Sequence, residues 1–361
     1  MNRFFLLPII LTSMISISAA KIKPVKVFIL AGQSNMEGKG KIDPLLNHQI
    51  KDKETKDFFA HFHKNGEYIM RDDVWINYLD RHGELTVGYG SPGCIGLELQ
   101  FGHIIGDYYD EQVLLIKTAW GGKSIGRDFR PPSSRAPSNK VLDQLVVKMI
   151  ERDYNNIIRK EWNKLKKHNP KITRKEVETE SSALFDEIRK VKKEEYHKQV
   201  VNSFGHFYRL MMNEIKTTLS ELKTRFPKYD GQGYEIAGFI WFQGWNDMYG
   251  DFPNEYAYNL ENFIRDVRKE LEVPNLPVAI GVMGQNGFKS AKGNMAIVKK
   301  AQFSMNDIAD FRGNVKAIPT DIYWDKRADE AFPYHYLGST ITFTRIGQPL
   351  AKTILELNSN K

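Results

Sequence analysis

Short apolar, β-branched runs alternate along this chain with longer amphipathic stretches, and this alternation constrains the fold more than any other feature. The apolar runs, interpreted as buried strands, are residues 25–30, 112–117, 236–242, 278–283 and 315–319. The stretches with helical spacing are residues 95–109, 141–160, 255–271, 296–308 and 340–357. Strands that alternate with helices form a mostly parallel sheet covered on both faces. Functional side chains in such sheets gather at the carboxyl ends of the strands, so the loops that follow them are the places to search for chemistry.

The first twenty residues, MNRFFLLPIILTSMISISAA, have the pattern of a secretory signal peptide. Arg3 supplies the positive start, residues 4–17 are mostly apolar, and small residues end the segment. The apolar part is too short to span a bilayer comfortably, although an uncleaved anchor is the alternative. No later apolar run approaches the length of a membrane span. We therefore expect an exported protein, periplasmic or secreted, whose mature domain is residues 21–361 and has no membrane span.

Composition narrows the function further. The single cysteine, Cys94, excludes an intramolecular disulfide framework and any cysteine-rich metal site. The formal net charge is +8, and half of the excess lies in residues 151–200, which carry 14 basic and 10 acidic residues. Because the two signs are mixed, this segment lacks the clustered cations of a nucleic-acid surface. We interpret it as part of a solvated helical insertion at about 130–200, with a partner or anionic-substrate surface as the alternative.

The loop after the first strand, AGQSNMEGKG at residues 31–40, is the strongest local signal for a site. A phosphate-binding loop needs four residues between its glycines and a hydroxyl after the lysine, but five residues separate Gly32 from Gly38, and Gly40 replaces the hydroxyl. The α/β-hydrolase elbow fails because Met36 occupies its second glycine position. Two interpretations remain. Ser34 is a nucleophile on a strand-to-helix turn, or it only caps the helix that follows.

Four blocks together resemble the SGNH (GDSL-like) hydrolases, and more narrowly the branch of sialate O-acetylesterases and family 6 carbohydrate esterases. They are residues 28–38 (FILAGQSNMEG), 117–125 (KTAWGGKSI), 240–247 (IWFQGWND) and 334–339 (YHYLGS). The blocks occur in the family's order, each near a predicted strand end or the loop after it. Trp245 is one departure, since that branch more often has glutamate there. The resemblance spans residues 28 to about 357, apart from the insertion.

The resemblance implies a serine esterase that removes acetyl groups from a carbohydrate. It maps the nucleophile onto Ser34 and the catalytic histidine onto His335, with oxyanion donors from Ser34, Gly122 and Asn246. Gln33, Gly121 and Gln243 would support them, and the two glycines can exchange roles. The implied fold is a three-layer α/β/α sandwich with about five parallel strands, and the implied chemistry needs no metal or organic cofactor.

One element of the family pattern is missing. The superfamily usually has an aspartate three residues before the histidine, and Phe332 stands there in this chain. Asp329 or Glu330 is our candidate for orienting His335, although each is equally open to being a solvated charge. A backbone carbonyl would instead leave a Ser–His dyad.

Two other functions stay open from the sequence. A carbohydrate-binding relative that has lost activity would keep the same fold, and an esterase or acyltransferase for another acyl group would keep the same chemistry. The expected partner is an acetylated carbohydrate, with no nucleic acid, and the sequence does not indicate an oligomeric state.

Overall fold

The computed structural model describes residues 23–44, 51–285, 287, 289–325 and 333–359. The predicted signal peptide at residues 1–20 lies outside these ranges, as do Asp329 and Glu330. Within the described residues, no helix is long and apolar enough to cross a membrane.

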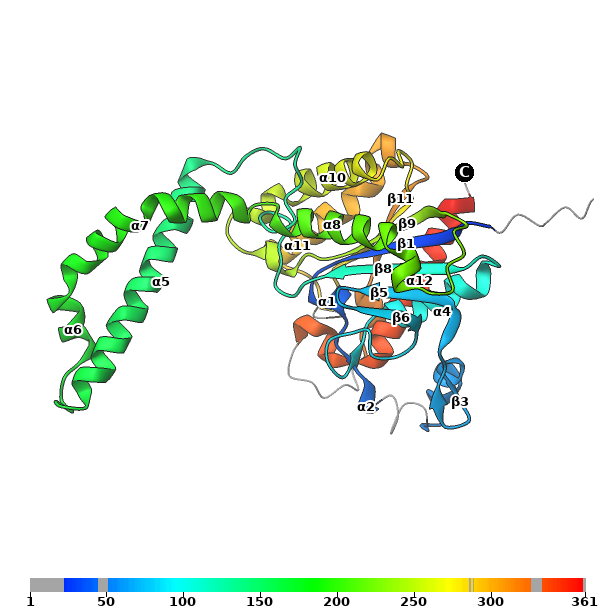
Figure 1. The fold of residues 1–361 in the computed structure, drawn as a ribbon, viewed down its shortest axis with the longest axis horizontal. Coiled ribbons are helices and arrows are strands. Elements are labelled where there is room, and N and C mark those ends of the chain that lie inside the picture. Colours follow the sequence, from blue (N-terminus) through cyan, green and yellow to red (C-terminus); the bar gives the residue numbers. More distant parts are fainter. Residues whose placement is uncertain (1–22, 45–50, 286, 288, 326–332, 360–361) are drawn as a thin grey trace, which may run out of the picture.

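A seven-stranded sheet forms the centre of the structure, in the order β11-β10-β9-β1-β8-β5-β6 (Figure 1). All neighbours are parallel except β5 and β6, which form an antiparallel edge. The strands are β1 Val25–Gly32, β5 Arg71–Tyr78, β6 Arg81–Leu85, β8 Val113–Ala119, β9 Tyr234–Phe242, β10 Val278–Val282 and β11 Val315–Pro319. The chain also forms two-stranded ribbons from β2 Gly40–Lys41 with β7 Cys94–Ile95, and β3 His63–Lys64 with β4 Glu67–Tyr68.

Helices cover both faces of this sheet, which confirms the predicted α/β/α class. Alternate residues of β1 show the division, because Val27 and Ile29 face one apolar core and Phe28 and Leu30 face the other. The first core is closed by α8 His206–Ser220, α10 Phe252–Glu270 and α11 Gly293–Phe303. The second is closed by α4 Glu98–Tyr108 and α12 Thr340–Ser359. Shorter helices are α1 Ser34–Glu37, α2 Ile42–Pro44, α3 Lys56–Phe59 and α9 Leu222–Arg225.

Each of the five predicted apolar runs forms a strand, and β5 and β6 extend the sheet beyond them. Residues 71–73 of β5 are Arg-Asp-Asp, and only the second half of that strand is buried. Its charged start hides the strand pattern that alternation would otherwise reveal.

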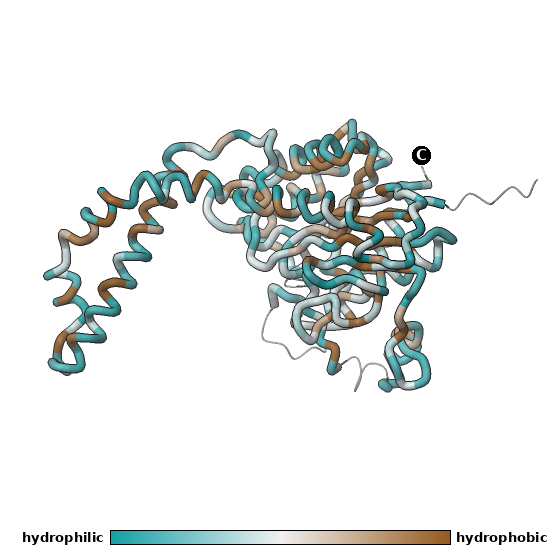
Figure 2. The backbone as a smooth tube through the Cα atoms, viewed as in Figure 1, coloured by the Kyte–Doolittle hydropathy of each residue, from teal (hydrophilic) through white to brown (hydrophobic). Residues whose placement is uncertain are grey.

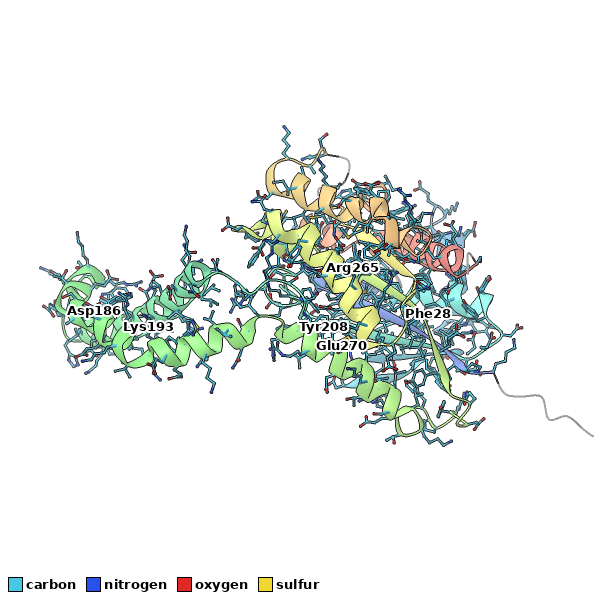
Figure 3. All side chains as sticks on the ribbon, turned by 90° about the horizontal axis from the view of Figure 1, so that it is seen from above. Phe28, Asp186, Lys193, Tyr208, Arg265 and Glu270 are labelled. Atoms are coloured by element: carbon cyan, nitrogen blue, oxygen red, sulfur yellow. The ribbon has the colours of Figure 1, made fainter. Side chains whose placement is uncertain are left out.

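A helical arm projects from the sheet domain between β8 and α8 (Figures 1 and 3). It consists of α5 Asn139–Lys166, α6 Arg174–Glu180 and α7 Ser182–Ser203. Its apolar contacts are concentrated near the sheet domain, where Leu142, Val146 and Ile150 of α5 pack with Tyr196 and Val200 of α7. Farther out the two helices are mostly hydrophilic, with scattered apolar residues (Figure 2). The largest apolar cluster of the arm therefore lies at its base, and Ile158 of α5 and Val177 of α6 are buried farther out.

Hydrogen bonds attach the base of the arm to the loop that follows β8. Arg127 donates from Nε to Ser203 Oγ at 3.0 Å, and its carbonyl accepts from the N–H of Gly205 at 2.8 Å. The N–H of Phe207 donates to the carbonyl of Asp128 at 2.9 Å. The loop that carries the Gly-Gly block is thus joined to the arm within a few residues.

Candidate active site

Ser34 lies at the carboxyl end of β1, near the middle of the parallel sheet. It is the first residue of α1, and only 7% of it is exposed. Gly32 makes the turn possible, because a side chain there would meet the backbone of Phe242 at 2.2 Å. The N–H of Ser34 has no hydrogen-bond partner among the described residues, as is usual for the first turn of a helix. The serine therefore presents both its hydroxyl and an unused donor at this edge of the sheet.

His335 meets Ser34 across 301 residues of sequence. The distance from His335 Nε2 to Ser34 Oγ is 3.0 Å. Burial and, to a lesser extent, the positive charge of Lys39 lower the pKa of His335 to about 4, while Glu37 acts in the opposite direction. The imidazole is therefore neutral near pH 7. A neutral imidazole at hydrogen-bond distance from a hydroxyl is the arrangement that general-base catalysis requires.

The segment that carries His335 is held in an unusual backbone conformation. Tyr336 and Leu337 follow it with φ values of 50° and 57°, a region that residues other than glycine rarely adopt. Tyr336 is fully buried, and its hydroxyl accepts from the N–H of Gly284 at 2.9 Å and lies 2.6 Å from Thr320 Oγ1. These contacts hold the left-handed turn in place and so fix where the histidine points.

Asn35 ties the serine turn to the histidine segment. Its Nδ2 donates to the carbonyl of Tyr334 at 3.1 Å. The Tyr334 ring lies 4.5 Å from that of His335 and 5.5 Å from that of Trp245, measured between centroids. The blocks around residues 34, 245 and 335 are therefore brought to one place. Among the described residues, no carboxylate accepts a hydrogen bond from the other ring nitrogen of His335, and the two candidates for that role, Asp329 and Glu330, lie outside the described ranges.

Gln33 orients Asn246. Its Nε2 donates to Asn246 Oδ1 at 3.2 Å, and its Oε1 accepts from the N–H of Gly244 at 3.1 Å. Because the Asn246 oxygen is engaged by Gln33, the Asn246 amide presents its Nδ2 elsewhere, and no protein acceptor for that nitrogen occurs within the described part of the chain. Asn246 is thus an oriented, unused donor on the short 3-10 helix Trp245–Met248.

The two glycines after β8 differ in their hydrogen bonding. The N–H of Gly121 donates to Glu37 Oε1 at 2.5 Å, so this donor is already used. Gly122 has a φ of 72° and open space around its Cα, and its N–H meets no acceptor in the described ranges. Of the pair, Gly122 is therefore the one that can donate to a ligand.

Gln243 and Asp247 form a buried network between the loop that follows β8 and the block that contains Asn246. The Asp247 carboxylate accepts from the N–H of Ile125 at 2.9 Å, the N–H of Gly126 at 2.7 Å and Gln243 Nε2 at 2.5 Å. Gln243 also donates to the carbonyl of Lys123 at 2.9 Å. Burial raises the pKa of Asp247 to about 7, against the effect of these hydrogen bonds. The network fixes the loop after β8 against the block that contains Asn246.

A buried ion pair fixes the end of α1. Lys117 Nζ donates to Glu98 Oε2 at 2.8 Å, to the carbonyl of Glu37 at 2.6 Å and to the carbonyl of Tyr89 at 2.7 Å. Burial lowers the pKa of Lys117, while Glu98 raises it. Both side chains are at most 1% exposed. Through its hydrogen bond to the carbonyl of Glu37, Lys117 therefore fixes the position of α1, the helix that begins with Ser34.

Sequence reasoning assigned no role to Asn35, Glu37, Lys117, Asp247 or Tyr336, although all five stand inside the quoted blocks. A charged residue at the end of the apolar run 112–117, before the Thr-Ala that continues it, is the one signal that would have singled out Lys117. Within the described residues, no group of three or more His, Cys, Asp or Glu is placed to hold a metal ion.

Taken together, a serine hydroxyl, a neutral imidazole and three unused N–H donors lie at one edge of the sheet. A nucleophile, a base and donors for a developing oxyanion are the requirements of acyl transfer. The arrangement is thus suited to attack on an ester carbonyl.

Comparisons with known proteins agree with this chemistry. A family model described as "Carbohydrate esterase, sialic acid-specific acetylesterase" matches residues 24–173 and 190–355. The X-ray structure of a protein from Arabidopsis thaliana aligns with a TM-score of 0.52 and 16% identity, over 92% of this chain and 98% of that chain. This likeness supports the α/β fold.

Two further solved structures align less well. A carbohydrate acetylesterase from Xanthomonas citri gives a TM-score of 0.48 at 11% identity, over 93% of this chain and 57% of that chain. The crystal structure of NanS aligns with a TM-score of 0.40 and 12% identity, over 86% of this chain and 81% of that chain. A comparison with curated protein sequences gave no match.

Proposed function

Because this chain belongs to the carbohydrate esterase family of sialic acid-specific acetylesterases and is therefore a carboxylic ester hydrolase, we propose that Ser34 and His335 hydrolyse an O-acetyl ester on a carbohydrate. The observation that carries this proposal is the 3.0 Å contact between Ser34 Oγ and His335 Nε2. A hydroxyl becomes an effective nucleophile when an adjacent base accepts its proton.

The first half of the reaction forms an acetyl-enzyme. Ser34 Oγ attacks the acetyl carbon while its proton moves to His335 Nε2. The carbonyl oxygen becomes an oxyanion, which the N–H groups of Ser34 and Gly122 and the Nδ2 of Asn246 stabilise. When the tetrahedral intermediate collapses, the bond to the sugar oxygen breaks, and that oxygen takes the proton from His335.

The second half releases acetate. Water attacks the acetyl carbon of the acetyl-serine and gives its proton to His335, again through an oxyanion held by the same donors. Collapse breaks the bond to Ser34 Oγ, which recovers a proton from the imidazolium. Water supplies the new oxygen of acetate, so no metal or redox partner is needed for the balance.

Asp329 or Glu330 remains our proposal for the group that orients the imidazole from its other nitrogen, with a Ser–His dyad as the alternative. We also place the reaction outside the cytoplasm, on the basis of the signal-like residues 1–20. An acetylated glycan, including acetylated sialic acid, is the substrate class that follows.

Acetate release from an aryl acetate and from a panel of O-acetylated sugars tests the mechanism. Ser34→Ala should abolish turnover and keep the fold, whereas Ser220→Ala, an exposed serine of α8, should behave as wild type. Asp329→Ala and Glu330→Ala should differ strongly, and equal retention of activity would favour the dyad. A folded Ser34→Ala enzyme with full turnover would overturn the proposal. Glycan binding without hydrolysis by the wild type would indicate an inactive relative.

A further inference from the structure

A pocket of about 580 Å³ lies where the base of the arm meets the start of α10. One wall comes from the arm, through Val141 and Leu145 of α5 and Phe204 at the end of α7. The opposite wall comes from the sheet domain, through Tyr249, Phe252 and Tyr258. Small-molecule sites have this size and this mixture of apolar walls and a few polar groups. The pocket exists only because the arm stands next to the sheet domain.

Exposed aromatic rings are the first sign of a ligand. Tyr249 is 58% exposed and Tyr258 is 38% exposed, although both line a concavity. A tyrosine has a flat apolar ring and a hydroxyl that forms hydrogen bonds. It therefore suits a ligand that has one apolar face and several hydroxyl groups. A pyranose ring is such a ligand.

Unpaired cations are the second sign. Arg135 and Lys148 both line the pocket, and neither forms an ion pair within the described residues. The Arg135 guanidinium lies 5.3 Å from the centroid of the Tyr258 ring. Arg130, by contrast, is fully engaged, since it donates to Glu255 at 2.8 Å and to the carbonyl of Gly126 at 2.7 Å. The rim also carries the carboxylate of Asp251, which leaves an excess of one positive charge for a ligand.

The pocket is close to the candidate active site. Tyr249 follows Asn246 by three residues, so their Cα atoms are at most ~11 Å apart. The pocket is also connected to the loop that follows β8. Arg130, which lines the pocket, donates to the carbonyl of Gly126, and the N–H of Gly126 donates to Asp247. The pocket therefore adjoins the block that contains Asn246.

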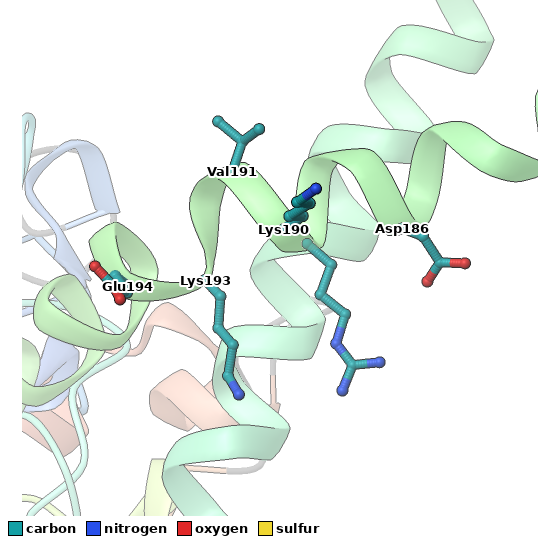
Figure 4. A pocket seen from close by; sticks show the side chains of 6 residues that line it. Asp186, Lys190, Val191, Lys193 and Glu194 are labelled. Atoms are coloured by element: carbon teal, nitrogen blue, oxygen red, sulfur yellow. The ribbon is translucent and has the colours of Figure 1, made fainter.

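A second hollow, on the outer face of α7, lacks these properties (Figure 4). All of its lining residues belong to one helix segment between Asp186 and Glu194. Val191 and Lys193 point to different sides of that helix, and no second element encloses them (Figure 4).

We propose that the pocket at the base of the arm is a subsite for a carboxylate-bearing sugar unit next to the one that carries the acetyl ester. Tyr249 and Tyr258 contact the face of its ring, and Arg135 and Lys148 bind its carboxylate. The description of this pocket as a substrate subsite rests on the proposed esterase function. The subsite gives the arm a role, which is to supply one wall of a binding site for an acidic glycan.

Calorimetric titration with two acidic trisaccharides without acetyl groups, sialyllactose and trigalacturonate, tests the subsite independently of hydrolysis. At least one should bind about tenfold or more tightly than neutral maltotriose, because a hydrogen bond to a charged group contributes that much. Lys148→Ala and Arg135→Ala should each weaken this binding about tenfold, and added salt should weaken it further. Tyr249→Ala should weaken it about two- to tenfold.

Matched controls are available on the same protein. Lys160→Ala changes an exposed lysine of α5 outside the pocket, and Tyr108→Ala removes a 57% exposed tyrosine at the end of α4. Neither control should alter the binding of the acidic trisaccharides or the hydrolysis of aryl acetate. The subsite is refuted if neither acidic sugar binds better than maltotriose, or if the pocket variants bind like wild type. A persistently active Ser34→Ala enzyme would refute the esterase mechanism alone and leave the binding result standing.

Discussion

Removing the Asp247 carboxylate should both destabilise the protein and loosen the loop that follows β8, which carries Gly122. In the Asp247→Ala variant, the N–H groups of Ile125 and Gly126 and the Nε2 of Gln243 lose their common acceptor. Asp247 is fully buried. Each buried donor without an acceptor costs about 1–3 kcal/mol, so three give about 3–9 kcal/mol. A water molecule that enters the vacated space restores part of this, and we expect a loss of about 3 kcal/mol in the free energy of unfolding.

Chemical denaturation followed by circular dichroism measures that loss, and aryl acetate hydrolysis measures the effect on the loop. Asp251→Ala is the matched control, because Asp251 is exposed and makes no capping hydrogen bond. Asp247→Asn keeps one acceptor oxygen and should fall between wild type and Asp247→Ala. We expect kcat to fall in Asp247→Ala while KM stays nearly constant, since the loop carries the Gly122 donor.

This structural role of Asp247 fails if the free energy of unfolding of Asp247→Ala lies within about 0.5 kcal/mol of the wild-type value, which is the range of ordinary surface substitutions. It also fails if Asp251→Ala costs as much as Asp247→Ala. A stability loss with unchanged kcat would show that the hydrogen bonds of Asp247 stabilise the fold but do not position the proposed oxyanion donors.

Three further predictions concern the base, the buried ion pair and the oxyanion. Because the pKa of His335 is lowered to about 4, kcat/KM should halve near pH 4 as pH falls, and a midpoint at the ordinary value of 6.5 would contradict this. Because of the same lowered pKa, the unfolded chain protonates His335 at a higher pH than the folded protein does. The free energy of unfolding should therefore fall as pH drops from 6.5 towards 4. Lys117→Met should cost about 3–5 kcal/mol in denaturation, because Glu98 is left buried and unpaired, and adding Glu98→Gln should recover part of it. Asn246→Ala should lower kcat about 10²–10³-fold with KM nearly unchanged, and steady-state kinetics that show only a KM change would refute its role.

The parallel sheet was predictable because a strand buried on both faces is a continuous apolar run. Residues 278–283 are such a run and became β10, which is buried along its whole length. β5 begins with the charged residues 71–73, and β6 is a partly exposed edge strand, so neither is a continuous apolar run and neither was predicted.

The candidate site was predictable as a set of blocks but not as a geometry. Gln33 meets Asn246 across 213 residues of sequence, and Asn35 meets Tyr334 across 299. Pairings at such separations are set by the sheet topology, which no local pattern encodes. The left-handed Tyr336 is harder still, because a bulky residue adopts that conformation only when tertiary contacts hold it there.

The left-handed turn at Tyr336 and Leu337 has a consequence for how the protein responds to heat. Each of these residues would gain about 1–2 kcal/mol by returning to an ordinary backbone conformation, and only the surrounding packing prevents it. As temperature rises and side-chain packing loosens, this turn should relax while the sheet is still intact. Thermal inactivation should therefore begin several degrees below the calorimetric melting transition, and cooling from that interval should restore activity without refolding of the chain.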